Sequence, residues 1–510
     1  MKTNFLYKVT FVLFSVFVLL PILYTLFSVF LEESFLDNLR LINSSTFLLL
    51  FRSIAISSLI AFLSTGLGVL LAFLLYKTKL SFRKGFRLLL LIPLFVSPYI
   101  LAVAWKDVLY LFFENHTFIA SYKGLVLILT SIFTPLSILI IGSALSNINS
   151  QIEESALLIV SPRTVMFRII LPLIKPALIS SFVLVFIFSI SEFTVPSYLG
   201  VKVFTTEIFT QFSAFYNHAL AVIQSALLIL ISIFLLFSEG KYLSEAAFLS
   251  IGTKGNQQKF HELGRFKIVA LIFLLAYLFS SVLMPYFMLV FQGMNDLGKA
   301  FDLLKPTIFN SVFLALGSSV LIVLVGFIVA YFSVKASKLK KIFDWILLIV
   351  FAIPSIILGI SFIKFYNQSA LSFIYTSYAI IVIAYIGKFT FIASKLISNA
   401  IRQVPKSLNE QAILIGISPL KRIRKILIPI IAPSLFVAFV ISFIFSFSEL
   451  SLTMMLYPPG TEIMPIKVFT IMANAPQSLV SAMSLIVFSI TLLLIVIFHL
   501  VYQKIKNTNV

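Results

Sequence analysis

Two glutamates at the ends of apolar stretches are the residues of this sequence best placed to do chemistry. Glu192 and Glu449 each follow a serine, Ser191 and Ser448, at the end of a long apolar run. A carboxylate in such surroundings is costly unless it is solvated or paired, which makes both acids candidate functional groups. As functional groups, the two carboxylates would attract a cation. Alternatively, they cap helix ends or mark the outer edge of a membrane.

Other residue types that support catalysis are scarce. The sequence has no Cys, which excludes disulfides, thiolate zinc sites, iron–sulfur clusters and cysteine nucleophiles. Its four His residues are widely separated, and it has no Gly-x-x-x-x-Gly-Lys-Ser/Thr phosphate-binding loop. We therefore expect no catalytic residue and no cofactor, and the sequence identifies no metal ligands. A membrane-embedded enzyme is a further alternative, for which the sequence offers no paired carboxylates, His cluster or nucleophile constellation.

The composition requires a membrane environment. Of the 510 residues, 60% are hydrophobic and 11% are charged, and the mean hydropathy is +1.11. A water-facing surface does not allow such values. Twelve runs without Asp, Glu, Lys or Arg are candidate bilayer spans of ~20 residues each. We therefore predict an all-α polytopic membrane protein with twelve transmembrane helices, at 9–31, 53–76, 88–105, 124–152, 176–191, 208–238, 268–295, 306–334, 345–363, 365–387, 426–448 and 468–503.

The basic residues predict the orientation of the spans. The two termini and the loops that share their side hold 29 of the 38 Lys and Arg residues but 7 of the 18 acids. Basic loops stay in the cytoplasm, so we expect both termini there. The same residues would contact anionic membrane lipids. We expect no nucleic-acid binding, because these patches lie beside helix ends and lack interleaved exposed aromatics.

An internal repeat covers nearly the whole chain. At an offset of 257, Ser161, Pro162, Pro172, Pro176, Ser189, Ser191 and Glu192 match Ser418, Pro419, Pro429, Pro433, Ser446, Ser448 and Glu449. Each copy holds six spans, an even number, so the copies have parallel orientation. We predict a first six-helix half at 1–238, a cytoplasmic linker at 239–266 and a second six-helix half at 267–510.

The best-matched part of the repeat lies in two predicted cytoplasmic loops. Its residues are Glu154, Ala156 and Pro172 in the first half, and Glu410, Ala412, Gly416 and Pro429 in the second. The glutamates offer a carboxylate to a partner, the alanines keep the surface low, and Gly416 permits a bend. The first-half motif is one residue shorter, and its glycine position is missing or replaced by Val160. An amphipathic connector on the lipid headgroups is the alternative interpretation.

These loop residues resemble the signature of bacterial ATP-binding-cassette importer permeases. The resemblance implies the type I importer permease fold, in which each loop forms a coupling helix against an ATP-hydrolysing subunit. It also implies that the helices ending at Ser191 and Ser448 line the central translocation pathway. Glu192 and Glu449 would then face each other across it and favour a cationic substrate. The resemblance also implies the partners: two cytoplasmic ATP-binding-cassette subunits and a periplasmic or lipid-anchored solute-binding protein. The expected location is the bacterial inner membrane.

The outer segments 203–208 and 457–469 make the chain similar to the ferric iron importer permeases, which implies iron(III) as substrate. Thiamine, 2-aminoethylphosphonate or a polyamine remain alternatives of the same class. A secondary transporter of the major-facilitator type is the alternative from a different class, since it also has two parallel six-span halves.

Overall fold

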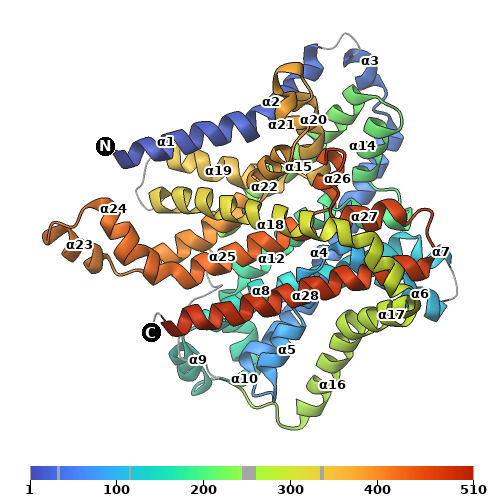
Figure 1. Cartoon of the computed structure of the whole chain (residues 1–510). Helices are drawn as coiled ribbons and strands as arrows, with labels where there is room; N and C mark the ends of the chain where they lie inside the picture. Colours follow the sequence, from blue (N-terminus) through green and yellow to red (C-terminus); the bar gives the residue numbers. More distant parts are fainter. Residues whose placement is uncertain (1, 32–34, 114–115, 244–259, 334–337, 509–510) are drawn as a thin grey trace. The chain divides into compact units, whose positions relative to one another are not determined.

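The computed structural model describes residues 2–31, 35–113, 116–243, 260–333 and 338–508 (Figure 1). Most of them lie in helices, and among them no β-strand occurs, so the predicted all-α class is confirmed. Residues 244–259 of the predicted linker lie outside this described part. The helices of residues 2–243 are α1 Lys2–Phe14, α2 Leu20–Ser28, α3 Phe35–Arg40, α4 Ser44–Lys77, α5 Arg83–Leu89, α6 Pro98–Phe113, α7 His116–Ile119, α8 Tyr122–Asn147, α9 Ser150–Leu157, α10 Pro162–Val165, α11 Leu171–Leu173, α12 Lys175–Ser191, α13 Thr194–Leu199, α14 Phe204–Ser213 and α15 His218–Leu243.

The remaining helices repeat this order of long and short elements. They are α16 Lys267–Leu278, α17 Met284–Gly293, α18 Leu297–Ser333, α19 Lys338–Ala352, α20 Ser355–Tyr366, α21 Ser372–Tyr375, α22 Tyr378–Gln403, α23 Lys406–Leu414, α24 Pro419–Arg422, α25 Ile428–Ser448, α26 Ser451–Leu456, α27 Met464–Ile471 and α28 Gln477–Thr508.

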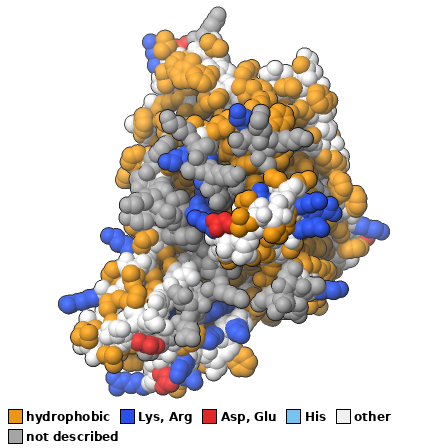
Figure 2. Space-filling view, turned by 90° about the vertical axis from the view of Figure 1, so that its left-hand side faces the viewer, with side chains coloured by type: hydrophobic (Ala, Val, Ile, Leu, Met, Phe, Trp, Pro, Cys, Tyr) orange, Lys and Arg blue, Asp and Glu red, His pale blue; other side chains and the backbone are white. Residues whose placement is uncertain are grey.

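The described helices are long and apolar enough for a polytopic membrane protein. Eight segments could cross a bilayer, or eleven if each of three bent helix pairs is one span. Large hydrophobic side chains are exposed on their outsides, as on α18, where Phe309 and Phe313 are open to the surroundings. Figure 2 shows hydrophobic side chains over much of the face it draws, together with many Lys and Arg side chains. Such an exterior fits lipid better than water.

Two of the bent pairs occupy equivalent places in the repeat. Residues 83–95 meet 98–111 at 102°, and residues 339–352 meet 355–366 at 105°. The predicted runs 88–105 and 345–363 are therefore each divided, beside Pro98 and Pro354. Proline disfavours helical conformation in the residue before it and lacks an N–H, which explains a break at these points.

Proline also widens four helices at the turn before it. In each case, a five-residue π-helix is followed directly by an α-helix whose second residue is proline. A proline cannot donate to the carbonyl four residues earlier, and a wider turn relieves the contact with its ring. The four π-helices are Ser15–Leu19, Met166–Ile170, Phe279–Leu283 and Ile423–Leu427, and their prolines are Pro21, Pro172, Pro285 and Pro429.

The chain divides into two compact units. Unit 1 takes residues 1–31, 302–467 and 487–510, and unit 2 takes residues 32–301 and 468–486. Each unit therefore combines most of one predicted half with the first helical segment of the other half, and unit 2 also takes residues 468–486 of the second half. The predicted halves describe the repeat in the sequence and stay a prediction, whereas the units describe packing.

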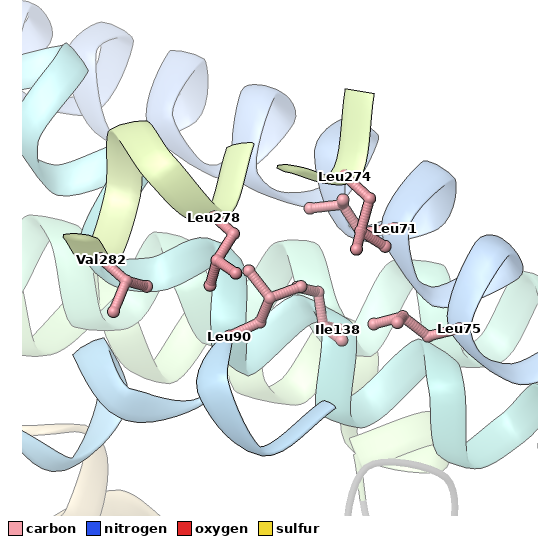
Figure 3. Packing of buried hydrophobic residues seen from close by; sticks show 7 residues of the cluster. All are labelled: Leu71, Leu75, Leu90, Ile138, Leu274, Leu278 and Val282. Carbon is pink, nitrogen blue, oxygen red and sulfur yellow. The ribbon is translucent and has the colours of Figure 1, made fainter. Parts of the chain in front are cut away.

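In unit 2, the segments from the second predicted half are residues 267–301, which begin with α16, and residues 468–486. Leu274, Leu278 and Val282 from the first of these segments lie in one buried cluster with Leu71 and Leu75 of α4, Ile138 of α8 and Leu90 (Figure 3). In the close-up, these side chains point into the space between the helices. In lipid, which is as apolar as these side chains, the cluster is stabilised by close packing rather than by removal from water.

In unit 1, the exchanged segment is the one that begins with α1. Tyr7 packs its ring against Phe332 and Phe343, with centroids 5.4 and 5.8 Å away. The Tyr366 hydroxyl donates to the Phe17 carbonyl at 2.8 Å. Phe17 is in a π-helix, whose displaced carbonyls are open to such donors. These contacts hold residues 2–31 within unit 1.

Candidate functional site

The first predicted coupling loop joins α9 to α10. The Asn149 side chain accepts from the Gln151 N–H at 3.0 Å and starts α9, which carries Glu154 on its exposed side. The Val160 N–H donates to the Ala156 carbonyl at 2.9 Å, and Ser161 then caps α10 by accepting from the Thr164 N–H at 3.4 Å. This loop turns without a left-handed residue, as Val160 at the glycine position requires.

The second predicted loop ends α23 differently. Gly416 has φ +73°, the left-handed conformation in which a side chain is strained. Its N–H donates to the Ile413 carbonyl and the Ile417 N–H donates to the Ala412 carbonyl, both at 3.0 Å. This pair of bonds is the Schellman motif. The predicted bend at Gly416 is therefore confirmed, and Glu410 lies exposed on the helix before it.

Each loop presents two exposed aliphatic side chains at its tip. Leu158 and Ile159 are 89% and 84% exposed. Leu414 and Ile415, which follow Glu410 at the same spacing as Leu158 and Ile159 follow Glu154, are 85% and 74% exposed. Exposed apolar pairs beside a carboxylate are typical of a surface that packs against another protein. None of these four residues was among the predicted site residues. Their matching positions in the repeat were the available indication.

The small residues of the motif face inward. Ala412 is only 3% exposed, so the expectation that it keeps an outer surface low is wrong. Ala156 is half-buried and packs against a cluster that contains Ile148 and Val165. A small side chain at these positions lets each short helix pack closely against the rest of the chain. The surface available to a partner is therefore formed by the exposed residues of the loop.

The motif prolines lie at equivalent positions but lead to different geometry. Pro172 is followed by a break at Ile174, where residues 166–173 and 175–191 meet at 56°. Pro429 is the second residue of α25, which continues without a break to Ser448. The two repeat copies therefore enter their long helices along different paths.

Glu192 caps the short helix that follows it. One carboxylate oxygen accepts from the N–H groups of Thr194 and Val195 at 2.9 and 3.2 Å, and from the Thr194 hydroxyl. The Glu192 carbonyl accepts from the Thr205 hydroxyl at 2.9 Å. Ser191, just before it, is half-buried. These bonds orient Glu192 at the start of α13.

Glu449 makes a corresponding bond in the other repeat copy. Its carboxylate accepts from the Leu452 N–H at 2.9 Å, and its carbonyl accepts from the Thr453 hydroxyl at 3.0 Å. Ser448 and Glu449 are both half-buried. The capping alternative for both acids is supported by these bonds, and the pathway role stays a prediction.

A small cavity with three serines in a mostly apolar lining lies beside Glu192. Ser53, Ser57 and Ser189 line it with Glu192, and it has room for about 10 Å³ of solvent. That volume accommodates about one water molecule. Ser53 also accepts from the Phe204 N–H at 2.9 Å, a bond repeated in unit 1 by Ser311 and the Met464 N–H at 2.8 Å. No group of three or more His, Asp or Glu side chains suited to a metal ion occurs in the described part of the chain.

A buried ion cluster beside the first loop was not predicted. Lys77, the last residue of α4, pairs with Glu153 of α9, and both side chains are fully buried. His261 places its Nε2 3.4 Å from the second carboxylate oxygen of Glu153. Burial by itself raises the pKa of Glu153, but the hydrogen bonds and charges of His261 and Lys77 bring it below the ordinary value of 4.5. Nothing in the local sequence brings these three residues together.

The comparisons with known proteins identify the same family in both repeat copies. A sequence profile described as "Binding-protein-dependent transport system inner membrane component" matches residues 64–245 and 322–507, more than half of the chain. The ferric transport system permease protein FbpB of Actinobacillus pleuropneumoniae is 25% identical over 466 residues. This match covers 83% of the chain but 65% of that relative, so the chain spans slightly less than two thirds of its length.

Two further relatives differ in how much of them is matched. The Fe(3+)-transport system permease protein FbpB 2 of Haemophilus influenzae is 23% identical over 436 residues, covering 83% of the chain and 84% of that protein. A Salmonella typhimurium permease whose name proposes 2-aminoethylphosphonate transport is 27% identical over 159 residues, covering 31% of the chain and 59% of that protein.

Proposed function

Because the chain belongs to the binding-protein-dependent transport system inner membrane component family, we propose that it is the membrane-spanning permease of an ATP-binding-cassette importer. The observation that carries the proposal is the match of this family to both repeat copies, each with an exposed loop tip. Membership of this family argues against a secondary transporter of the major-facilitator type.

The proposed topology has twelve spans in two parallel sets of six, with both termini in the cytoplasm of a bacterium. The continuous helical stretch Gly264–Phe332 has 69 residues, long enough for two crossings of ~20 residues each. Counting it as two adds one span to the eleven that include the bent pairs. The excess of Lys and Arg on the loops that carry the coupling motif favours the cytoplasmic side.

The two loop tips are the proposed contacts with the energy-supplying subunits. Leu158 and Ile159 would enter a groove on one ATP-binding-cassette subunit, and Leu414 and Ile415 would enter the same groove on a second. Glu154 and Glu410 would pair with basic groups at the rim. We propose that a solute-binding protein, periplasmic or lipid-anchored, delivers the substrate at the opposite side.

Iron(III) is the proposed substrate. Relatives named for ferric or Fe(3+) transport match more than four fifths of the chain, whereas the relative named for 2-aminoethylphosphonate matches about a third of it. The second candidate substrate is therefore 2-aminoethylphosphonate. Thiamine and polyamines remain further candidates, and they share a positive charge with iron(III).

Glu192 and Glu449 are the proposed acidic residues of the translocation pathway, together with Ser191 and Ser448. Their capping bonds fix each carboxylate at the end of a long helix. A glutamine keeps the acceptor oxygen of the cap but removes the charge. In the double variant Glu192→Gln/Glu449→Gln, we expect the rate of iron(III) uptake to fall while the melting temperature stays close to that of wild type. Unchanged uptake would leave only the capping role.

Transport in proteoliposomes tests the proposal. The chain would be reconstituted with the ATPase and binding protein from neighbouring genes, and uptake of radioactive iron(III), thiamine and 2-aminoethylphosphonate would be measured. We expect ATP-dependent uptake of iron(III). Uptake that persists without the ATPase contradicts the importer mechanism, and ATP-dependent uptake of another solute contradicts the substrate.

Loop-tip variants test the coupling role. We expect Leu158→Ser/Leu414→Ser to lower the amount of ATPase that copurifies with the chain. Phe82→Ser is the matched control, because Phe82 is 86% exposed between α4 and α5 and lies outside both loops. Equal copurification of the two variants would rule out the tips as the docking surface.

A further inference from the structure

A short piece of the predicted linker is bound next to the first coupling loop. We call residues Phe260, His261 and Glu262 the linker strap. The His261 N–H donates to the Lys77 carbonyl at 2.7 Å, and the Lys79 N–H donates to the His261 carbonyl at 3.0 Å. These two bonds pair the strap with the chain at the end of α4.

Side chains hold the strap at the same place. The Arg83 guanidinium lies over the Phe260 ring, 3.6 Å from its centroid. Lys79 pairs with Glu262 at 2.9 Å, but both side chains are largely exposed, so this pair contributes little. The backbone pairing and the stacked ring therefore fix the strap more than its surface charges do.

The strap completes the surroundings of Glu153. One carboxylate oxygen accepts from Lys77 and the other faces His261 Nε2 at 3.4 Å. Both charges of the pair are fully buried, and the His261 side chain is 22% exposed. A buried ion pair persists only when its remaining polar atoms are satisfied. The position of α9, which carries Glu153 and Glu154, therefore depends on the strap.

The second loop is held in another way. The residue equivalent to Glu153 is Asn409, which is exposed and accepts from Arg422 of its own loop at 3.2 Å. That loop also closes through the turn at Gly416. Its shape is thus determined by bonds within the loop, whereas the first loop is bonded to α4 and to the strap.

We propose that Lys77, Glu153 and His261 are positioning residues through which the linker fixes the first coupling loop in the orientation that engages the ATPase. The role in transport rests on the proposed function. Without the cluster, the first coupling loop would still form, but it would sample a wider range of orientations relative to α4. The conformational change of the ATPase during ATP hydrolysis is then transmitted less completely through the first coupling loop to the translocation pathway.

Spin labels measure the loop directly, independent of transport. The chain has no Cys, so Ser155→Cys on α9 and Phe62→Cys on α4 supply two unique exposed label sites in unit 2. We expect a narrow distance distribution for the otherwise unchanged chain and a broad one after His261→Ala. The double variant Lys77→Met/Glu153→Leu removes both charges without leaving one unpaired, so it keeps the fold and also broadens the distribution.

Two controls accompany this measurement. Glu262→Gln changes a carboxylate of the strap that is outside the cluster, and we expect no broadening. Labels at Gln411→Cys and Phe309→Cys in unit 1 report on the second loop, and His261→Ala should leave their distribution unchanged. A distribution at the first loop that is equally narrow in all variants overturns the proposal.

Proteoliposomes supply the functional readout. We expect His261→Ala to lower the number of iron(III) ions moved per ATP hydrolysed severalfold, with ATPase copurification retained. A broadened loop with an unchanged ratio overturns the positioning role, as does a lowered ratio with a narrow loop. Absence of ATP-dependent uptake in wild type instead contradicts the proposed function, and the spin-label result still decides whether the strap fixes the loop.

Discussion

Gly68 of α4 lies against Ser137 of α8 with no room for a side chain. A Cβ at Gly68 would be 2.5 Å from the Ser137 Cβ and 3.2 Å from the Ser137 carbonyl carbon. The Ser137 hydroxyl accepts from Ser181 of α12 at 2.9 Å, and Thr65 is 3.3 Å from Ser181. Close backbone contact at small residues and hydroxyl bonds between helices are the usual means of helix association in lipid.

We therefore expect Gly68→Ala to destabilise unit 2. Overpacking a tight helix contact costs about 1–3 kcal/mol, because backbone atoms have to move apart. A Cβ at Gly66 on the same helix would have no atom within 4 Å, so Gly66→Ala should be neutral or stabilising by up to about 1 kcal/mol. Melting of the purified chain in detergent measures both. Equal melting temperatures would contradict the close contact.

Gly326, which matches Gly68 in the repeat at an offset of 258, should respond more weakly. Its Cβ would meet Ala393 Cβ at 3.0 Å, so a shift of a few tenths of an ångström relieves the contact. We expect Gly326→Ala to lower the melting temperature less than Gly68→Ala does. If Gly326→Ala lowers the melting temperature more, the ability of the surrounding helices to move apart, and not the distance to the nearest atom, determines the cost at these two glycines.

Gly416→Ala should strain the second coupling loop. No atom would lie within 4 Å of the new Cβ, so the cost comes from the left-handed backbone, about 1–2 kcal/mol. Gly416→Asn should cost less, since asparagine tolerates this conformation better. We expect ATPase copurification to decrease in the order glycine, asparagine, alanine. Val160→Gly in the first loop is the control, and no gain is expected there because that turn has no left-handed residue.

Glu153→Gln should destabilise the chain more than removal of both charges. The single change leaves Lys77 buried without a carboxylate, a situation that costs about 3–5 kcal/mol. Lys77→Met/Glu153→Leu leaves no buried charge and should melt closer to wild type. Melting curves in detergent compare the variants, with Glu262→Gln as the exposed control. A double variant less stable than the single one would contradict this account.

The stabilising effect of Glu153 should disappear in acid. Its folded-state pKa is below the ordinary 4.5, so the ionised pair stabilises the folded chain at all pH values above that number. As the pH falls below 4.5 and through the folded pKa, the carboxylate becomes protonated and the contribution is lost. The difference in melting temperature between wild type and Glu153→Gln should therefore be present at neutral pH and shrink as the pH falls below 4.5. A difference that grows in acid would contradict the lowered pKa.

Features with a local cause could be predicted from the sequence. Apolar run length predicts the helices, because a span needs ~20 apolar residues whatever it packs against. Gly416 predicts a left-handed turn, because only glycine adopts it without strain. The two helix breaks also had a visible cause in Pro98 and Pro354, although run length alone counts each region as one span.

Features that depend on contacts distant in the sequence could not be predicted. Lys77 and His261 lie 76 and 108 positions from Glu153, and no periodicity links the three residues. The burial of Ala412 depends on packing around its helix, which a motif does not describe. The exchange of first helical segments between the repeat copies likewise arises from apolar surfaces that match only in three dimensions.

That exchange determines when the chain can finish folding during its synthesis. Unit 1 needs residues 1–31, which the ribosome makes first, but also residues 302–467 and 487–510. Unit 2 holds most of the first half, yet it also needs residues 468–486. Multidomain chains generally fold from the N-terminus as each domain emerges. Here neither unit is complete until nearly all of the chain has entered the membrane, so the early helices must wait in the bilayer with their packing surfaces covered by lipid or by the insertion machinery.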